Sequence, residues 1–197
     1  MSHDQLLALL AFAFVTSMTP GPNNLMLMAS GANFGLRRSV PHMLGVGVGF
    51  VVMLMGVGAG LAELFAAVPY ADAVLKAVSV AYLLFLAGKI ALAAPPEAGQ
   101  TRGRPMTFLG AAAFQWVNPK AWAMALSAVS VYAPSQSLPG IAAVAAVFGA
   151  VNLPSVSSWT LLGHSMRALL TDPGRRRAFN AVMALLLIAS LYPILAH

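Results

Sequence analysis

The chain has 197 residues, of which 59% are hydrophobic and only 8% are charged. Soluble domains carry about 25% charged residues, so this composition excludes an ordinary soluble domain, and its high hydrophobicity excludes a disordered chain. The net charge of +6 would suit a nucleic-acid-binding protein, but the basic residues stand between long apolar segments, where they orient a membrane protein, so no nucleic-acid partner is expected.

Residues of the common metal and redox sites are scarce in this sequence. It contains no cysteine, which excludes disulfides, thiolate metal sites and thiol redox chemistry. Its four histidines show none of the spacings that metal-binding motifs use. We therefore predict no bound metal, no cofactor and no catalytic residue.

Six long apolar segments follow one another along the chain, each close to the length of about 20 residues that spans a bilayer. They are residues 5–29, 41–61, 74–93, 108–131, 139–162 and 178–196. The sequence therefore predicts an all-α, polytopic membrane protein with six transmembrane helices in a lipid bilayer. Since no positively charged segment precedes the first apolar stretch, we expect this stretch to be a helix and not a cleaved signal.

Basic residues are distributed unevenly between the loops. Nine of them lie at or after the ends of the first, third and fifth segments, whereas only Lys76 lies on the opposite side. Because Lys and Arg favour cytoplasmic loops, we predict that these three loops are cytoplasmic and that both termini lie on the other side of the membrane. The nine are Arg37, Arg38, Lys89, Arg102, Arg104, Arg167, Arg175, Arg176 and Arg177.

The most polar stretch, residues 95–106, divides the chain into residues 1–94 and residues 107–197, each with three predicted helices. Its prolines, glycines and charges are typical of a linker, here on the predicted cytoplasmic side. If the halves are homologous, an odd number of helices in each inverts the second half, as in many secondary transporters. We predict one integral membrane domain of two inverted three-helix repeats.

The first helix of each half contains a predicted break. In the first segment, two prolines flank a glycine and cannot continue a regular helix, and in the fourth a proline precedes a lysine. Interrupted helices at corresponding positions of two halves indicate a transport site, so we predict broken helices 1 and 4 with substrate between them. The alternative is two proline kinks whose asparagines bond to neighbouring helices. The predicted substrate-binding residues are Pro20, Gly21, Pro22, Asn23, Asn118, Pro119 and Lys120.

Lys120 carries the strongest functional signal. A lysine at the centre of a transmembrane helix costs about 2.5–3.5 kcal/mol on insertion scales, and no Asp or Glu in a predicted span core can neutralise it. We expect its partner to be a backbone carbonyl, water or the anionic group of a ligand. In the alternative, Lys120 only bonds to the carbonyls that Pro20 and Pro22 free.

Two further segments have a packing interpretation beside a functional one. Asn152 lies near a proline and three serines in the fifth segment, where it either lines a cavity or stabilises helix packing. We add Asn152 to the predicted substrate-binding residues. Glycines in the second segment, among them Gly45 and Gly49, predict close helix packing, within the chain or in a homodimer.

Together these motifs resemble the LysE/RhtB family of amino-acid exporters, over essentially the whole chain. The resemblance lies in Thr19-Pro20-Gly21-Pro22-Asn23, in Tyr82-Leu83-Leu84 before Gly88-Lys89, and in Asn118-Pro119-Lys120-Ala121. The stretches at residues 39–45 and 114–122 are most similar to the branch that exports cysteine and O-acetylserine. The resemblance implies a bacterial inner-membrane exporter of a small neutral amino acid, driven by the proton gradient, with both termini in the periplasm.

An amino acid needs a site with both polarities. Lys120 and the helix N-termini after the breaks would attract its carboxylate. The side-chain oxygens of Asn23, Asn118 and Asn152, with freed backbone carbonyls, would accept from its ammonium group. Alternating access would follow from rocking one half against the other.

Alternatives remain for the driving force and for the class of protein. The span cores contain no Asp or Glu to relay protons, and His42 and His164 lie near predicted span ends, so facilitated export without coupling stays open. An intramembrane enzyme would need a serine and a histidine on facing helices, and none are evident. A structural membrane protein would leave Lys120 and the two breaks without a reason.

Overall fold

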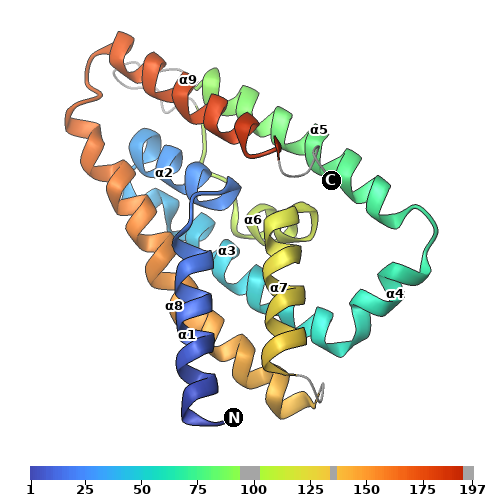
Figure 1. Ribbon diagram of the computed structural model, residues 1–197. Helices are drawn as coiled ribbons and strands as arrows, with labels where there is room; N and C mark the ends of the chain where they lie inside the picture. The colour runs from blue at the N-terminus through green and yellow to red at the C-terminus, as the bar shows by residue number, and fades with distance from the viewer. Residues whose placement is uncertain (94–102, 134–136, 193–197) are drawn as a thin grey trace.

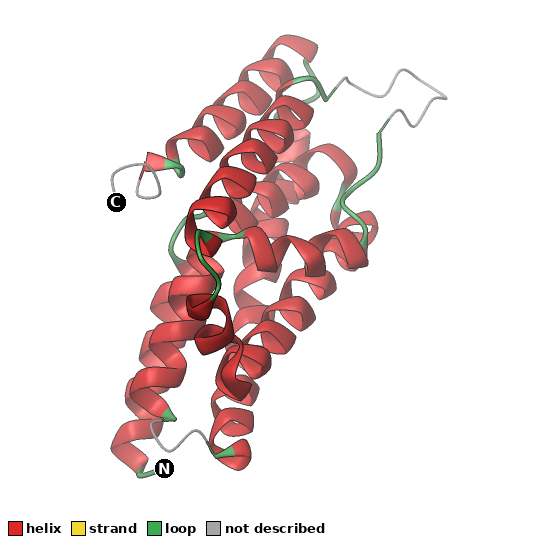
Figure 2. Cartoon of the chain, turned by 90° about the vertical axis from the view of Figure 1, so that its right-hand side faces the viewer, coloured by secondary structure: helices red, strands yellow, loops and turns green. Residues whose placement is uncertain are grey.

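The computed structural model describes residues 1–93, 103–133 and 137–192, in which every regular element is a helix (Figure 2). The all-α prediction is therefore confirmed for these residues. Most of the predicted linker, namely residues 95–102, lies outside them. The helices are α1 (His3–Met18), α2 (Pro22–Phe34), α3 (Leu36–Gly56), α4 (Ala62–Ala67), α5 (Ala71–Ala91), α6 (Phe108–Phe114), α7 (Pro119–Tyr132), α8 (Leu138–Ser165) and α9 (Pro173–Ala189).

Several of these helices are long and apolar enough to cross a membrane. Three stretches qualify alone, namely Leu36–Ala67, Ala71–Ala91 and Leu138–Ala168, and α1 with α2 forms a fourth, bent by 55°. The remaining described apolar helix, Phe108–Val117, is shorter, and α9 has 17 residues. The chain is thus a polytopic membrane protein, with three to four candidate spans among the described residues.

The second predicted span is longer than its apolar core suggested. The helix begins at Leu36, not at residue 41, because Gly35 adopts a φ of 83° that favours glycine and ends the preceding helix. Arg37 and Arg38 are exposed in the first turns, so their charges do not oppose the helix. At the other end the chain continues past residue 61 to Ala67, with a kink at Gly60, whose φ is 101°.

Both predicted helix breaks are present. Gly21 is extended between α1 and α2, and Asn118 is extended between a short 3₁₀ turn after α6 and α7. Pro22 and Pro119 occupy the first positions of α2 and α7, where a missing N–H costs no helical hydrogen bond. Each proline therefore starts a new helix.

The principal helix contacts join the first three predicted spans to the last three. α8 packs along α1, α2 and α3, α3 packs on α6, and α5 lies beside α9 (Figure 1). In the core of this interface the rings of Phe50 from α3 and Phe148 from α8 are 5.3 Å apart. The two predicted halves are therefore interleaved within one helical domain.

Close packing of the glycine-bearing helix occurs within the chain. A methyl group at Gly45 would overlap the carbonyl group of Phe108, and a Cβ at Gly49 would lie 2.5 Å from Cα of Ala112. The glycines thus let α3 and α6 touch through their backbones, as the spacing predicted. The homodimer stays a prediction.

Basic residues from different loops meet at one end of the molecule. The Arg38 side chain donates to the carbonyl of Gly103 at 3.3 Å, and the Arg167 guanidinium lies against Gly35. The N-terminus lies at the opposite end (Figure 1). The loops predicted to be cytoplasmic therefore share one end, and the side of the membrane on which it lies stays a prediction.

Candidate functional site

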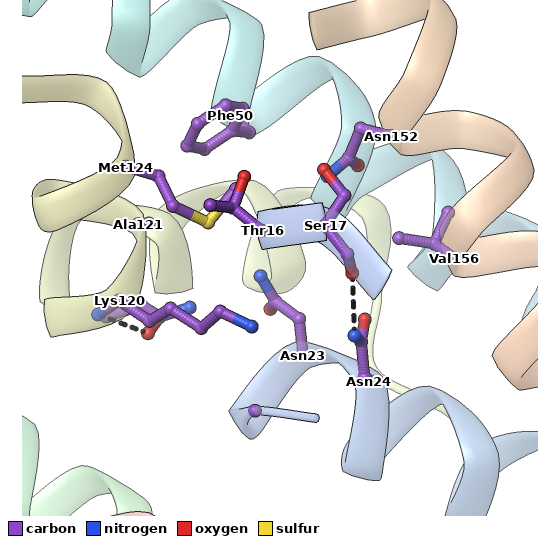
Figure 3. Close-up of a pocket in the computed structure, with 12 residues that line it drawn as sticks. Thr16, Ser17, Asn23, Asn24, Phe50, Lys120, Ala121, Met124, Asn152 and Val156 are labelled. Carbon is purple, nitrogen blue, oxygen red and sulfur yellow. Dashed lines mark hydrogen bonds between the residues drawn. The ribbon is translucent and has the colours of Figure 1, made fainter. Parts of the chain in front are cut away.

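A small cavity separates the two helix breaks. Its volume is about 20 Å³, room for about one water molecule. The cavity is lined by Thr16, Ser17, Gly21, Asn23, Asn24, Phe50, Asn118, Lys120, Ala121, Met124, Asn152 and Val156 (Figure 3). These residues come from α1, α2, α3, α7 and α8 and from the break residues, so both halves of the chain build the cavity.

Most of the predicted substrate-binding residues meet here. Gly21, Asn23, Asn118, Lys120 and Asn152 line the cavity, although the last of them is far along the sequence from the first. The predicted prolines do not line it. Pro22 and Pro119 start α2 and α7, and Pro20 is exposed at the bend. Pro22 and Pro119 therefore set where the half-helices begin, and a substrate contact by the three prolines stays a prediction.

The Lys120 side chain reaches from α7 across to the end of α1. Its Nζ donates to the carbonyl oxygen of Thr19 at 2.5 Å. A backbone carbonyl is one of the three kinds of partner that the sequence suggested, beside water and a ligand anion. An ammonium group has three N–H donors, and no other acceptor is recorded for Lys120 within the described residues. Lys120 therefore keeps donors for a ligand even in this arrangement.

The two half-helices that start at the breaks differ at their N-termini. The Asn118 side chain accepts from the backbone N–H of Lys120 at 3.2 Å and caps α7. Gly21 has no side chain with which to cap α2, so the first amides of α2 remain open. A Cβ at Gly21 would lie only 2.7 Å from Cδ of Lys120. An ammonium group and an open helix N-terminus thus adjoin, which suits an anion.

Carbonyl groups at the end of α1 are satisfied by side chains from other helices. The carbonyl of Ser17 accepts from the Asn24 amide and from the Ser155 hydroxyl, both at 2.8 Å. The carbonyl of Met18 accepts from the indole of Trp159 at 3.3 Å. Inside a membrane no bulk water can bond to the carbonyls that a broken helix leaves free, so side chains must donate to them. These side-chain donors show that the rest of the fold stabilises the break.

Two of the predicted ammonium acceptors already have partners. The Asn23 and Gln115 amides bond reciprocally, at 2.8 and 3.2 Å, and the Asn118 oxygen caps α7. By contrast, Oδ1 of Asn152 is buried without a partner, and so is Oγ of Ser17. Two buried acceptors without a partner among the described residues are therefore on α8 and α1.

Sequence reasoning missed Ser17, Asn24 and Gln115 as parts of this region. Each is a hydroxyl or amide inside an apolar segment, and that polarity was the available signal. His42 was expected near a span end, but it lies two turns inside α3 and is 2% exposed, with no partner for either ring nitrogen. It does not line the cavity.

Comparison with known proteins identifies the family. The family model described as LysE type translocator matches residues 14–190. The chain belongs to this family. LysE-type translocators are membrane transporters and not enzymes, so both predictions are confirmed.

Curated relatives of this translocator match nearly its whole length. A cysteine/O-acetylserine efflux protein of Escherichia coli O139:H28 is 31% identical, with 95% of this chain and 96% of the relative covered. The protein of the same name from Escherichia coli K12 is 30% identical over the same shares. That of Shigella flexneri serotype 5b is 31% identical over 90% of each chain. No solved structure matches significantly.

Proposed function

We propose that this LysE-type translocator is a secondary transporter that exports a small neutral amino acid from the cytoplasm across the bacterial inner membrane. Cysteine and O-acetylserine are the first candidates, because the relatives at 30–31% identity are named as efflux proteins for these compounds. The observation that carries the proposal is the meeting of Lys120 with the open N-terminus of α2 in a cavity between two broken helices.

This meeting point suits the carboxylate of an amino acid. The carboxylate would accept from the remaining N–H donors of Lys120 and from the first backbone amides of α2, at Asn23 and Asn24. On entering, it competes with the Thr19 carbonyl for the Lys120 ammonium. A carboxylate that moves Lys120 therefore alters the contact that ties α7 to α1. This link gives substrate binding a direct effect on the two breaks.

Helix contacts support an arrangement of six spans as two inverted repeats. In that arrangement α1 with α2, α3 and α5 correspond to α6 with α7, α8 and α9. Exchanging corresponding helices turns the packing of α8 on α1 into the packing of α3 on α6, and it leaves the α3–α8 and α5–α9 pairs in place, whereas the extensive α2–α8 packing has only a slight counterpart between α3 and α7. Such self-consistency is expected of a two-fold axis in the membrane plane.

The same contacts favour motion at the breaks over rocking of one whole half. Because α8 packs on three helices of the first half, a rigid separation of the halves would expose most of the core. Three non-helical residues, 19–21, separate α1 from α2, and the single extended residue Asn118 precedes α7. A change of backbone angles at either place moves a half-helix as a unit. We place the alternating opening of the cavity there, with the arginine-rich end towards the cytoplasm.

Transport by the purified protein in liposomes tests this function. The liposomes are loaded with radiolabelled cysteine under reducing conditions, and its release is followed with and without an imposed pH gradient. Protein-free liposomes provide the control. We expect protein-dependent release that the gradient accelerates. Release that ignores the gradient would favour facilitated export. The absence of release for cysteine, O-acetylserine and the other small neutral amino acids would overturn the proposal.

A further inference from the structure

Two residues that line the cavity each carry a buried polar atom without a hydrogen-bond partner among the described residues. They are Oγ of Ser17 in α1, whose residue is 5% exposed, and Oδ1 of Asn152 in α8, whose residue is 6% exposed. Figure 3 shows both side chains at the same side of the cavity, apart from the Lys120 ammonium. Buried polar groups in proteins nearly always have a partner, so this pair calls for one.

The neighbouring hydroxyl groups show that Ser17 had a local alternative. In α1 the hydroxyls of Thr16 and Thr19 donate to carbonyls one turn back, Phe12 at 2.6 Å and Val15 at 2.5 Å. The Ser17 hydroxyl makes no such bond. It therefore stays available to a ligand, whereas the flanking hydroxyls are engaged with their own helix.

The same contrast holds in α8. The hydroxyls of Ser157 and Thr160 donate to carbonyls of their own helix, and the Ser155 hydroxyl donates to the Ser17 carbonyl. The Asn152 oxygen has no donor. Ser155 already fixes α8 against α1 at this level, so Asn152 is not needed for that contact.

The chemistry of Oγ of Ser17 and Oδ1 of Asn152 favours a ligand group with several N–H donors. An amide oxygen only accepts hydrogen bonds, and a hydroxyl can accept as well. A carboxylate would place an acceptor against Oδ1 of Asn152 and gain nothing there, whereas an ammonium group supplies three donors. The cationic end of the cavity, at Lys120, is separate from this acceptor pair.

We propose that Ser17 and Asn152 form the subsite for the substrate ammonium group and that Ser17 sets the preference for α-amino compounds. This inference rests on the proposed function. Once the helix breaks have opened the cavity, the substrate lies between the two subsites, with its carboxylate at Lys120 and α2 and its ammonium between α1 and α8. Both contacts involve one helix from each half, so a bound amino acid joins the halves at two points.

Counterflow of radiolabelled O-acetylserine in proteoliposomes tests the subsite. Two unlabelled competitors are compared: cysteine, and 3-mercaptolactate, in which a hydroxyl replaces the ammonium group. The variants are Ser17→Ala and Asn152→Leu, and the control is Ser157→Ala, whose hydroxyl bonds within α8 outside the cavity. We expect each site variant to weaken competition by cysteine about tenfold, the loss of one hydrogen bond to a charged group, and to leave 3-mercaptolactate unchanged.

Thermal stability separates this role from a structural one. Removing an unpartnered hydroxyl breaks no hydrogen bond, so the melting temperature of Ser17→Ala should be no lower than that of the unaltered protein. A variant that loses a structural contact would have a lower melting temperature. Unchanged competition by cysteine, or an equal loss for both competitors, would overturn the subsite while leaving the transporter intact. Absence of counterflow in the unaltered protein would instead overturn the proposed function, and the ammonium subsite with it.

Discussion

The helices that follow the two breaks begin with the same residue type, proline, but they differ in how their N-termini are capped. Both α2 and α7 have proline at their first position, yet Asn118 caps α7 with its side chain while Gly21 leaves α2 uncapped. Lys120, at the second position of α7, reaches over to the uncapped break. One break is thus closed by its own residues, and the other is open to an anion and lies beside a cation. In the proposed site, one break supplies a side chain and the other supplies backbone amides, so matched breaks need not contribute to binding in the same way.

Lys120→Met should give the largest effect, because it removes the only cation that lines the described cavity. Each hydrogen bond to a charged group contributes about 1.5–3 kcal/mol, so we expect cysteine counterflow to fall at least about tenfold. Competition by cysteamine, which lacks a carboxylate, should be unaffected. The matched control is Lys89→Met in α5, whose ammonium lies over the Phe85 ring at 5.4 Å. Equal transport by Lys120→Met and the unaltered protein would contradict the carboxylate role.

Asn23→Leu should act mainly on stability. The Asn23 and Gln115 amides bond to each other across the two breaks, and Gln115 is 0% exposed. An unpaired buried amide costs about 1–3 kcal/mol, which thermal unfolding in detergent would register. The double variant Asn23→Leu with Gln115→Leu should recover part of the loss, as a double-mutant cycle can show. Strictly additive losses would mean that the pair does not hold the breaks together.

Gly21→Ala should weaken substrate binding with little change in folding. The φ of Gly21 is −169°, which any residue adopts, but the added Cβ would press on the Lys120 side chain at 2.7 Å. We expect about a fivefold higher half-saturation concentration, roughly 1 kcal/mol. Gly88→Ala in α5 is the control, because a Cβ there meets nothing within 4 Å. Equal half-saturation concentrations in Gly21→Ala and Gly88→Ala would contradict a place for Gly21 in the binding site.

Asn118→Ala should have the smallest effect on transport and stability, because it changes only the capped break before α7. Loss of a helix N-cap costs about 0.5–1 kcal/mol, so the melting temperature should fall by a few degrees, while Asn118→Ser, which can still cap, should melt near the unaltered protein. Half-saturation for cysteine should change less than in Gly21→Ala. A larger transport defect in Asn118→Ala than in Gly21→Ala would reverse the comparison between the breaks.

Much of the fold follows from local properties of the sequence. Uncharged stretches long enough to span a bilayer predict the helices, and prolines that lack an N–H predict both breaks. The cost of an unneutralised lysine in a membrane singled out Lys120. The predictions of helices and of both breaks succeed because each depends only on neighbouring residues and on the solvent, while the role of Lys120 stays a prediction.

Partner choice among polar side chains depended on the tertiary structure. Asn23, Asn118 and Asn152 look equivalent in the sequence, yet the first pairs with Gln115, the second caps its own helix, and the third remains free. The sequence by itself determined a polytopic helical protein with two breaks and a costly lysine. Only the tertiary structure decided which polar atoms of the described residues have no partner, because hydrogen bonds are satisfied by whatever the packing of distant helices brings within about 3 Å.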